Sequence, residues 1–178
     1  MTKKIFGLII MMTVLIGMIT NCYSVSSYSG DGRLTDNGPG AATDRYVLDL
    51  GTVNLDKQNT QIYHIKDLPV ENFVICIQIN APPENRILID KQAINSIMFI
   101  ELIGPNHESL ISVQAPLNTW TWSSDDSNTA YIYRRNKPDT YFTPIKNGQY
   151  KLKVEIVQPD SSTLKYVARL LMKSGGWK

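Results

Sequence analysis

The chain is poor in the residues from which disulfide scaffolds, metal sites and many catalytic sites are built. Its 178 residues include two cysteines and two histidines. Two cysteines exclude a disulfide-rich mini-protein and a zinc site of four cysteines. Charged residues make up only 19% of the chain, and the net charge of +2 is too small to indicate nucleic-acid binding. The 43% hydrophobic content excludes an intrinsically disordered chain, and the length suits one domain.

The sequence also lacks the common catalytic motifs. It contains no G-x-S-x-G elbow, no H-E-x-x-H pair and no phosphate-binding G-x-x-x-x-G-K-[ST] loop. His64 falls within a short predicted strand and His107 within a predicted turn, so neither is paired with a nucleophile by any recognisable spacing. We therefore expect a protein that is not an enzyme and that needs no cofactor or metal ion.

One acidic loop, residues 123–129, is the exception that could carry chemistry. Asp125 and Asp126 are adjacent, so in an extended chain they point in opposite directions and do not form a carboxylate pair for hydrolysis. With Asn128 they could offer oxygen ligands to calcium, but their spacing does not match an EF-hand loop. A solvated polar loop is the favoured interpretation.

The first 21 residues have the pattern of a secretory signal. Lys3 and Lys4 precede an uncharged apolar run of 15 residues, from Ile5 to Ile19. This run is shorter than the roughly 18 residues expected of a membrane-spanning helix. Ordinary cleavage near Cys22 and an uncleaved anchor helix are two interpretations of this segment. A third, lipid attachment at Cys22, comes from the residues that end the run.

The end of the run, Ile19-Thr20-Asn21-Cys22, resembles a bacterial lipobox. The resemblance implies that the Cys22 thiol carries a lipid and that the chain is cut before it. Asn21 departs from the Gly, Ala or Ser usual in that family. Because Tyr23, and not Asp, follows the cysteine, the resemblance implies an outer-membrane lipoprotein that faces the periplasm. The membrane would then be a partner through Cys22.

The remaining chain divides into a tether and one domain. Residues 22–43 are rich in Ser and Gly without apolar periodicity, which predicts a flexible linker. Residues 44–178 show short runs that alternate between apolar and polar residues, separated by turn signals. The runs at 150–156 and 164–172 read as an antiparallel hairpin, and Gly51 reads as a break after the first strand. Strands are predicted at residues 46–50, 62–65, 73–80, 86–90, 97–103, 110–113, 119–122, 130–134, 150–156 and 164–172.

This pattern predicts an all-β fold, a single antiparallel β-sandwich of jelly-roll or immunoglobulin-like type with about eight strands. The domain resembles the small exported β-sandwich domains of proteobacterial lipoproteins, on the hairpin Gly104-Pro105-Asn106 and the strand start at residues 147–152. Asp90 to Met98 could form a helical turn. Cys76 is expected to be a free, buried thiol within a strand.

A cluster of aromatic residues is the strongest indication of a binding surface. Exposed, it could stack sugar rings or anchor a protein partner; buried, it would be core packing. Both interpretations remain open from the sequence. The candidate surface consists of Trp120, Trp122, Tyr131, Tyr133, Arg134 and Arg135, near Tyr141 and Phe142.

These observations lead to one main functional hypothesis and two competitors. The main hypothesis is a non-catalytic cell-envelope lipoprotein that binds an envelope protein or a glycan. The first competitor is a periplasmic immunity or inhibitor protein against a secreted toxin or lytic enzyme. The least favoured is a hydrolase with an unrecognised carboxylate site. Removal of residues 1–21 takes away Lys3 and Lys4, so the mature chain has 16 basic and 16 acidic residues and nucleic acid is a still poorer candidate partner.

Overall fold

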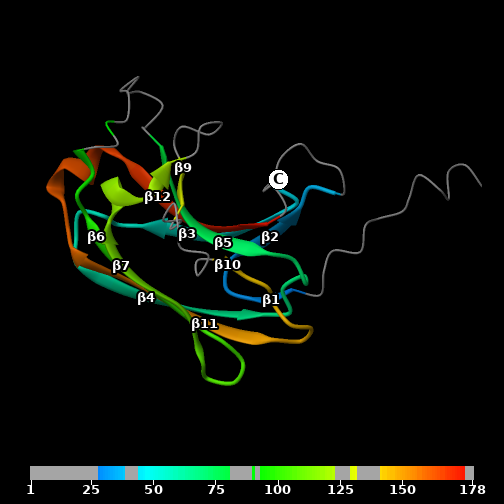
Figure 1. The fold of residues 1–178 in the computed structure, drawn as a ribbon. Helices are drawn as coiled ribbons and strands as arrows, with labels where there is room; N and C mark the ends of the chain where they lie inside the picture. Colours follow the sequence, from blue (N-terminus) through cyan, green and yellow to red (C-terminus); the bar gives the residue numbers. More distant parts are fainter. Residues whose placement is uncertain are drawn as a thin grey trace, which may run out of the picture.

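The computed structural model is a sandwich of two antiparallel sheets (Figure 1). It describes residues 28–38, 44–80, 90, 93–122, 129–131 and 141–174. The all-β sandwich expected from the sequence is confirmed. The first sheet runs in the order β1 (Ser29–Gly30), β4 (Asn59–Lys66), β11 (Gln149–Gln158), β6 (Ile97–Ile103) and β7 (Ser109–Pro116). The second runs β2 (Arg33–Asp36), β3 (Tyr46–Val53), β12 (Val167–Ser174), β5 (Phe73–Asn80), β9 (Thr129–Tyr131) and β8 (Thr121–Trp122), and β10 (Tyr141–Phe142) also pairs with β5.

Eight of these strands have the nested pairing of a jelly roll. In chain order the first, β3, pairs with the last, β12, and β4 pairs with β11. Inside them β5 pairs with β9, and β6 pairs with β7. This is a long hairpin rolled into two sheets, and it decides between the two sandwich types that the sequence left open. The remaining strands β1, β2, β8 and β10 have four residues or fewer.

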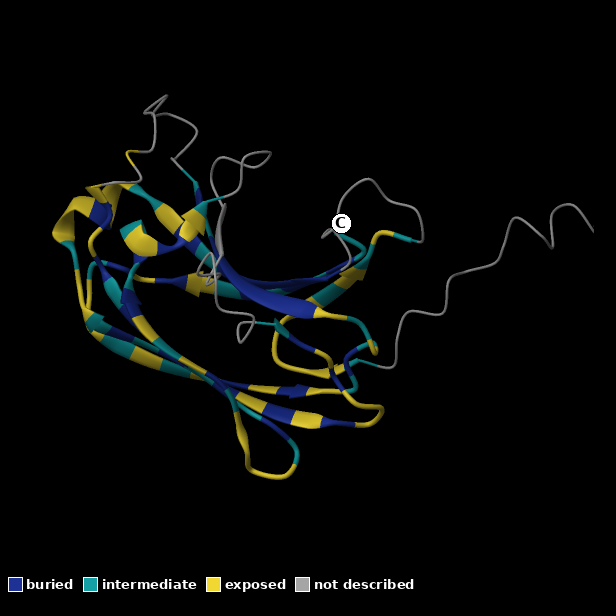
Figure 2. Cartoon of the chain, in the orientation of Figure 1, coloured by how far each residue is buried: buried dark blue, intermediate teal, exposed yellow. Residues whose placement is uncertain are grey.

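The period-2 pattern of the sequence places the core between the sheets. Along β11 the buried residues Tyr150, Leu152, Val154 and Ile156 alternate with exposed or half-buried ones. β5 is buried along most of its length on both faces, which Figure 2 shows as a nearly continuous dark strand. β6 has the bounds predicted from its apolar run, and it is an interior strand between β11 and β7.

The predicted hairpin between residues 150–156 and 164–172 is wrong. β11 pairs with β4 and β6 in one sheet, whereas β12 pairs with β3 and β5 in the other. Residues 161–165 form the short 3-10 helix η4 (Ser161–Lys165), which carries the chain from one sheet to the other. Two strands that each bury one face can pack across a sandwich as well as pair side by side, so periodicity does not distinguish the two arrangements.

The predicted tether is also too long. Residues 29–30 and 33–36, assigned to a flexible linker, form β1 and β2 and pair with β4 and β3. The sandwich therefore begins by Tyr28 and not at Asp44. Two strands this short bury little side-chain surface, so they leave no apolar alternation in the sequence.

Local irregularities account for smaller differences. Gly51 does not end its strand, because β3 continues to Val53 through a bulge opposite Leu170 and Leu171, with Gly51 at φ +98°. The predicted strand at 119–122 is preceded by the 3-10 helix η2 (Leu117–Thr119) and shortens to β8. Between Asp90 and Met98, the Ala93 amide donates to the Asp90 carbonyl at 3.2 Å. The predicted strand at 86–90 and the loop at 123–128 lie outside the described residues, apart from Asp90.

Candidate functional site

A cleft of about 370 Å³ opens at the edge of the sandwich where β1 and β2 cross from one sheet to the other. Its walls come from the crossing segment and from the strands β3 and β4, which lie next to the short edge strands β2 and β1. Its mixture of polar and apolar side chains suits a ligand that offers both hydrogen bonds and apolar groups. The lining residues are Asp31, Gly32, Leu50, Thr52, Gln61, Ile62 and Tyr63.

Two glycines allow the chain to make this crossing. Gly30 and Gly32 have φ values of +133° and +87°, which favour glycine. A Cβ at Gly30 would lie 2.3 Å from the His64 carbonyl oxygen, and one at Gly32 would lie 2.5 Å from that of Asp49. The segment Ser29-Gly30-Asp31-Gly32 has the turn chemistry of glycines around an aspartate, and this was the sequence signal that could have revealed the crossing.

The β4 edge beside the cleft offers backbone hydrogen-bonding groups. His64 is held from this side by Asp31, whose amide donates to the His64 carbonyl at 2.8 Å and whose carboxylate accepts from the His64 amide at 2.7 Å. Because backbone groups alternate in direction along an antiparallel strand, the amides and carbonyls of Ile62 and Thr60 face the same side. In the part of the chain that the structure describes, no strand pairs with this side of β4 before Ile65.

A polar bridge joins the two sheets across this edge. The Gln61 amide group donates to the Thr52 carbonyl at 3.3 Å, and its carbonyl oxygen accepts from the Tyr63 hydroxyl at 2.8 Å. Gln61 therefore ties β4 to β3 and fixes the Tyr63 phenol at the inner wall of the cleft. Ile62, on the outer face of the strand, is 48% exposed.

Two tyrosines beside the cleft have pKa values above the ordinary value of the phenol. Burial, followed by the charge of Asp31, raises the pKa of the Tyr28 phenol to about 12. The same two causes, in the same order, raise the pKa of the Tyr63 phenol. Tyr28 packs against the core and donates to the Asp31 carbonyl, so it closes the sandwich beneath the crossing.

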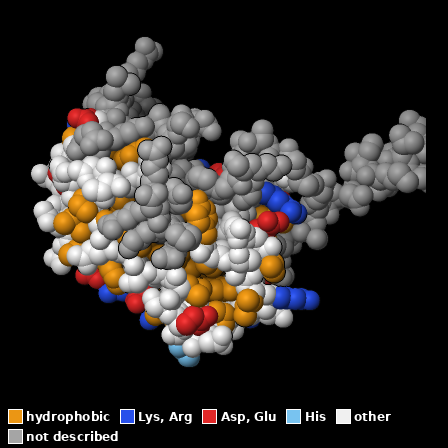
Figure 3. Space-filling model, viewed as in Figure 1, with side chains coloured by type: hydrophobic (Ala, Val, Ile, Leu, Met, Phe, Trp, Pro, Cys, Tyr) orange, Lys and Arg blue, Asp and Glu red, His pale blue; other side chains and the backbone are white. Residues whose placement is uncertain are grey.

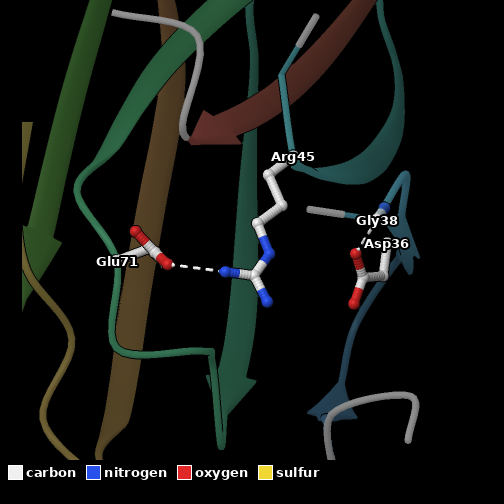
Figure 4. A network of polar contacts seen from close by, with 4 residues as sticks. All are labelled: Asp36, Gly38, Arg45 and Glu71. Carbon is white, nitrogen blue, oxygen red and sulfur yellow. Dashed lines mark hydrogen bonds and ion pairs between the residues drawn. The ribbon is translucent and has the colours of Figure 1, made fainter. Parts of the chain in front are cut away.

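The far end of β2 is fixed by a separate polar network (Figure 4). The Arg45 guanidinium lies between Asp36 and Glu71 and pairs with Glu71 at 3.0 Å. The Asp36 carboxylate accepts from the Gly38 amide at 2.8 Å, which holds the chain as it leaves the strand. Together with the Tyr28 contact, this network holds both ends of the crossing segment.

The two tryptophans of the candidate aromatic surface are not both exposed. Trp120 is 5% exposed and belongs to the main core, and Trp122 is half-buried against that core. For Trp120 this decides between the two interpretations that the sequence left open, because a ring within the core has no face to offer a ligand. The backbone of Tyr131 pairs with Cys76 in β5. Tyr133, Arg134 and Arg135 lie outside the described residues.

The other sequence candidates lie apart from the cleft or outside the described residues. His107 occupies a turn and has φ +63°, whereas the exposed His64 lies beside the cleft only through its backbone. Cys76 is fully buried. Cys22 and the acidic loop at 123–128 are not among the described residues. Across the described ranges, no group of three His, Cys, Asp or Glu side chains is placed to hold a metal ion, and no helix is long and apolar enough to cross a membrane.

Comparisons with known proteins give information about the fold and not about function. No family model and no curated protein matches the sequence. Among solved structures, the chain is similar to one described as the crystal structure of GEBA250068378 from Sulfurospirillum deleyianum, with a TM-score of 0.51. The match covers 74% of this chain and 98% of that chain at 8% sequence identity. The structural match shows a shared fold, and at so low an identity it does not indicate a function.

Proposed function

We propose that this protein is a non-catalytic cell-envelope lipoprotein that binds an extended segment of another envelope protein along β4. Cys22 carries the lipid, and the sandwich faces the periplasm from the outer membrane. The observation that carries the binding proposal is the open edge of β4 at Thr60 and Ile62, next to the cleft.

An extended peptide suits this edge better than a glycan does. A peptide added beside β4 would continue the pairing that Asp31 begins at His64, and it would satisfy the outward backbone groups of Ile62 and Thr60. Alternate side chains of such a peptide would enter the cleft beside Leu50 and Gln61. A glycan offers hydroxyl groups but no regular repeat of amides and carbonyls that matches a strand edge.

A pair of substitutions at Ile62 tests this binding mode. Ile62→Pro removes the outward amide that a peptide strand would use, whereas Ile62→Thr keeps that amide and the β-branched shape. A photo-crosslinking amino acid at the exposed Thr52 position reports the partner in intact cells. We expect one protein adduct in the wild-type and Ile62→Thr chains and its loss in Ile62→Pro, with unchanged thermal unfolding in all three. An adduct that persists in Ile62→Pro would contradict strand addition.

The anchoring half of the proposal has its own test. Cells grown with a labelled fatty acid should label the wild-type chain and leave Cys22→Ser unlabelled, and the wild-type chain should fractionate with the outer membrane. A wild-type chain that takes up no label, with the same mobility as Cys22→Ser, would overturn the lipid attachment.

A further inference from the structure

We propose that one end of the sandwich docks directly on the lipid bilayer through two apolar loop tips. This end, here called the anchor end, consists of the loop at residues 67–72 and the loop at residues 143–148. The inference deepens the proposed function, because it rests on lipid attachment at Cys22.

The two loops are held together as one surface. The Asp67 amide donates to the Gly148 carbonyl at 3.1 Å, and the Thr143 hydroxyl donates to the Asn72 side-chain carbonyl. The bonds join the start of each loop to the end of the other, so the loops run antiparallel. Their middle residues therefore project from the same end of the sandwich.

Each loop carries a proline followed by an exposed β-branched residue at its middle. Val70 follows Pro69 and is 61% exposed, and Ile145 follows Pro144 and is 56% exposed. These are two of the five large apolar side chains that the described residues expose. Exposed hydrophobic atoms gather at this end of the molecule in Figure 3, beside basic and acidic side chains.

The loops are fixed in this outward arrangement from beneath. Leu68, two residues before Val70, is buried in the core at 3% exposure. The Ile145 amide donates to the buried Tyr150 hydroxyl at 2.8 Å, which holds the second loop over the end of β11. With these backbones fixed, neither apolar tip turns inward.

The path of the N-terminal chain identifies the occupant as a bilayer. Ser29 and Gln149 pair with Lys66 from its two sides, so the chain begins its first strand directly beside both loops. Tyr28 follows Cys22 by only six positions in the sequence. At about 3.3–3.6 Å for each extended residue, this distance is at most about 22 Å. A lipid on Cys22 therefore keeps the anchor end within reach of the membrane surface, where a longer tether would not.

The charged side chains at the anchor end can contact lipid headgroups, but they do not attract this surface strongly to the bilayer. Lys66 and Lys146 are exposed beside the tips, and their long side chains can reach the headgroup phosphates. Asp67 and Glu71 are half-buried, and Glu71 is paired with Arg45. The apolar tips therefore supply most of the attraction, so docking should depend little on the content of anionic lipid.

Labels at the loop tips test the docking in the lipidated full chain. We would place a single nitroxide at Val70→Cys, at Ile145→Cys or at the control Leu164→Cys, and reconstitute each chain in phosphatidylethanolamine–phosphatidylglycerol vesicles. Leu164 is 70% exposed and lies in η4, between the end of β11 and the start of β12, at the opposite end of the sandwich. Cys76 is fully buried and so does not compete for the label.

Collision with oxygen and with a water-soluble nickel complex then reports the depth of each label. We expect labels at 70 and 145 to gain oxygen accessibility and lose nickel accessibility on vesicles, and the label at 164 to remain as in water. Equal water exposure at all three sites, in a chain that still sediments with the vesicles, would overturn the docking and leave the lipid anchor standing. A chain that does not sediment with the vesicles would overturn both.

Discussion

The Asp160 carboxylate accepts a hydrogen bond from the backbone amide of Asn95, 2.9 Å away, although 65 residues separate the two along the chain. The same carboxylate accepts from the Ser162 amide at 2.9 Å and so caps η4, while the Asp160 amide donates to the Leu55 carbonyl at 3.0 Å. Asp160 thus joins three segments at the point where the chain passes from one sheet to the other.

We predict that Asp160→Ala lowers the free energy of unfolding by about 1–2 kcal/mol, the typical cost of a lost cap. Chemical denaturation would measure the loss, with Ser161→Ala, an exposed neighbour in η4, as the control. A loss no greater than that of Ser161→Ala would show that the carboxylate does not hold the three segments together.

The same carboxylate predicts an acid dependence of stability. Burial raises the pKa of the Asp160 carboxyl, but the bonds from the Asn95 and Ser162 amides outweigh it and lower the pKa below its ordinary value. A lowered pKa in the folded state stabilises the fold above the unfolded pKa, near 4, and this contribution is lost as the pH falls through the folded value. Asp160→Asn should therefore unfold with a weaker dependence on pH below 4 than the wild-type chain. Parallel curves for the two chains would contradict this.

Gly32→Ala should detach the crossing segment from the sandwich. A Cβ there meets the Asp49 carbonyl oxygen at 2.5 Å, in addition to the strain of a positive φ. Gly38→Ala is the matched control, because its φ of +84° is similar and a Cβ there meets nothing within 4 Å. Hydrogen exchange of residues 29–36 should be faster in Gly32→Ala than in the wild-type chain and unchanged in Gly38→Ala. Exchange at the wild-type rate in both variants would mean that the segment tolerates the side chain.

Tyr28 should titrate later than ordinary tyrosines. Its phenol has a pKa of about 12, raised by burial and then by Asp31. The stability that it contributes is present in full below the unfolded pKa of about 10 and is lost as the pH rises toward 12. Phenolate absorbance should therefore show a late component that Tyr28→Phe removes, and Tyr28→Phe should lose less stability between pH 10 and 12. A Tyr28→Phe titration identical to that of the wild-type chain would disprove the assignment.

Trp120 should act on stability and not on binding. Because its ring lies in the core, Trp120→Ala should lower the free energy of unfolding by about 3–5 kcal/mol, as for other buried aromatic residues. Trp122→Ala, at the half-buried neighbour, should cost less. Thermal unfolding compares the two, and a Trp120→Ala chain with wild-type stability would return the ring to the candidate binding surface.

The sequence by itself determined the all-β class and the positions of the strands that bury one face. The alternation in Phe73–Asn80 and the apolar run of Ile97–Ile103 predicted β5 and β6 with their observed bounds, because the side-chain period of two records which face is buried. The sequence predicted that the first strand ends at Gly51, but the strand continues through a bulge there. Glycine is common both at bulges and at strand ends, so its presence does not distinguish the two.

Only the tertiary structure decided which strands are neighbours and where the cleft lies. β11 and β12 belong to opposite sheets, and residues 29–36 close the sandwich edge as β1 and β2. Whether Trp120 faces the core was likewise decided by the sheet opposite it. These outcomes depend on contacts between segments far apart in sequence. Periodicity records that a face is buried, but it does not record what buries it.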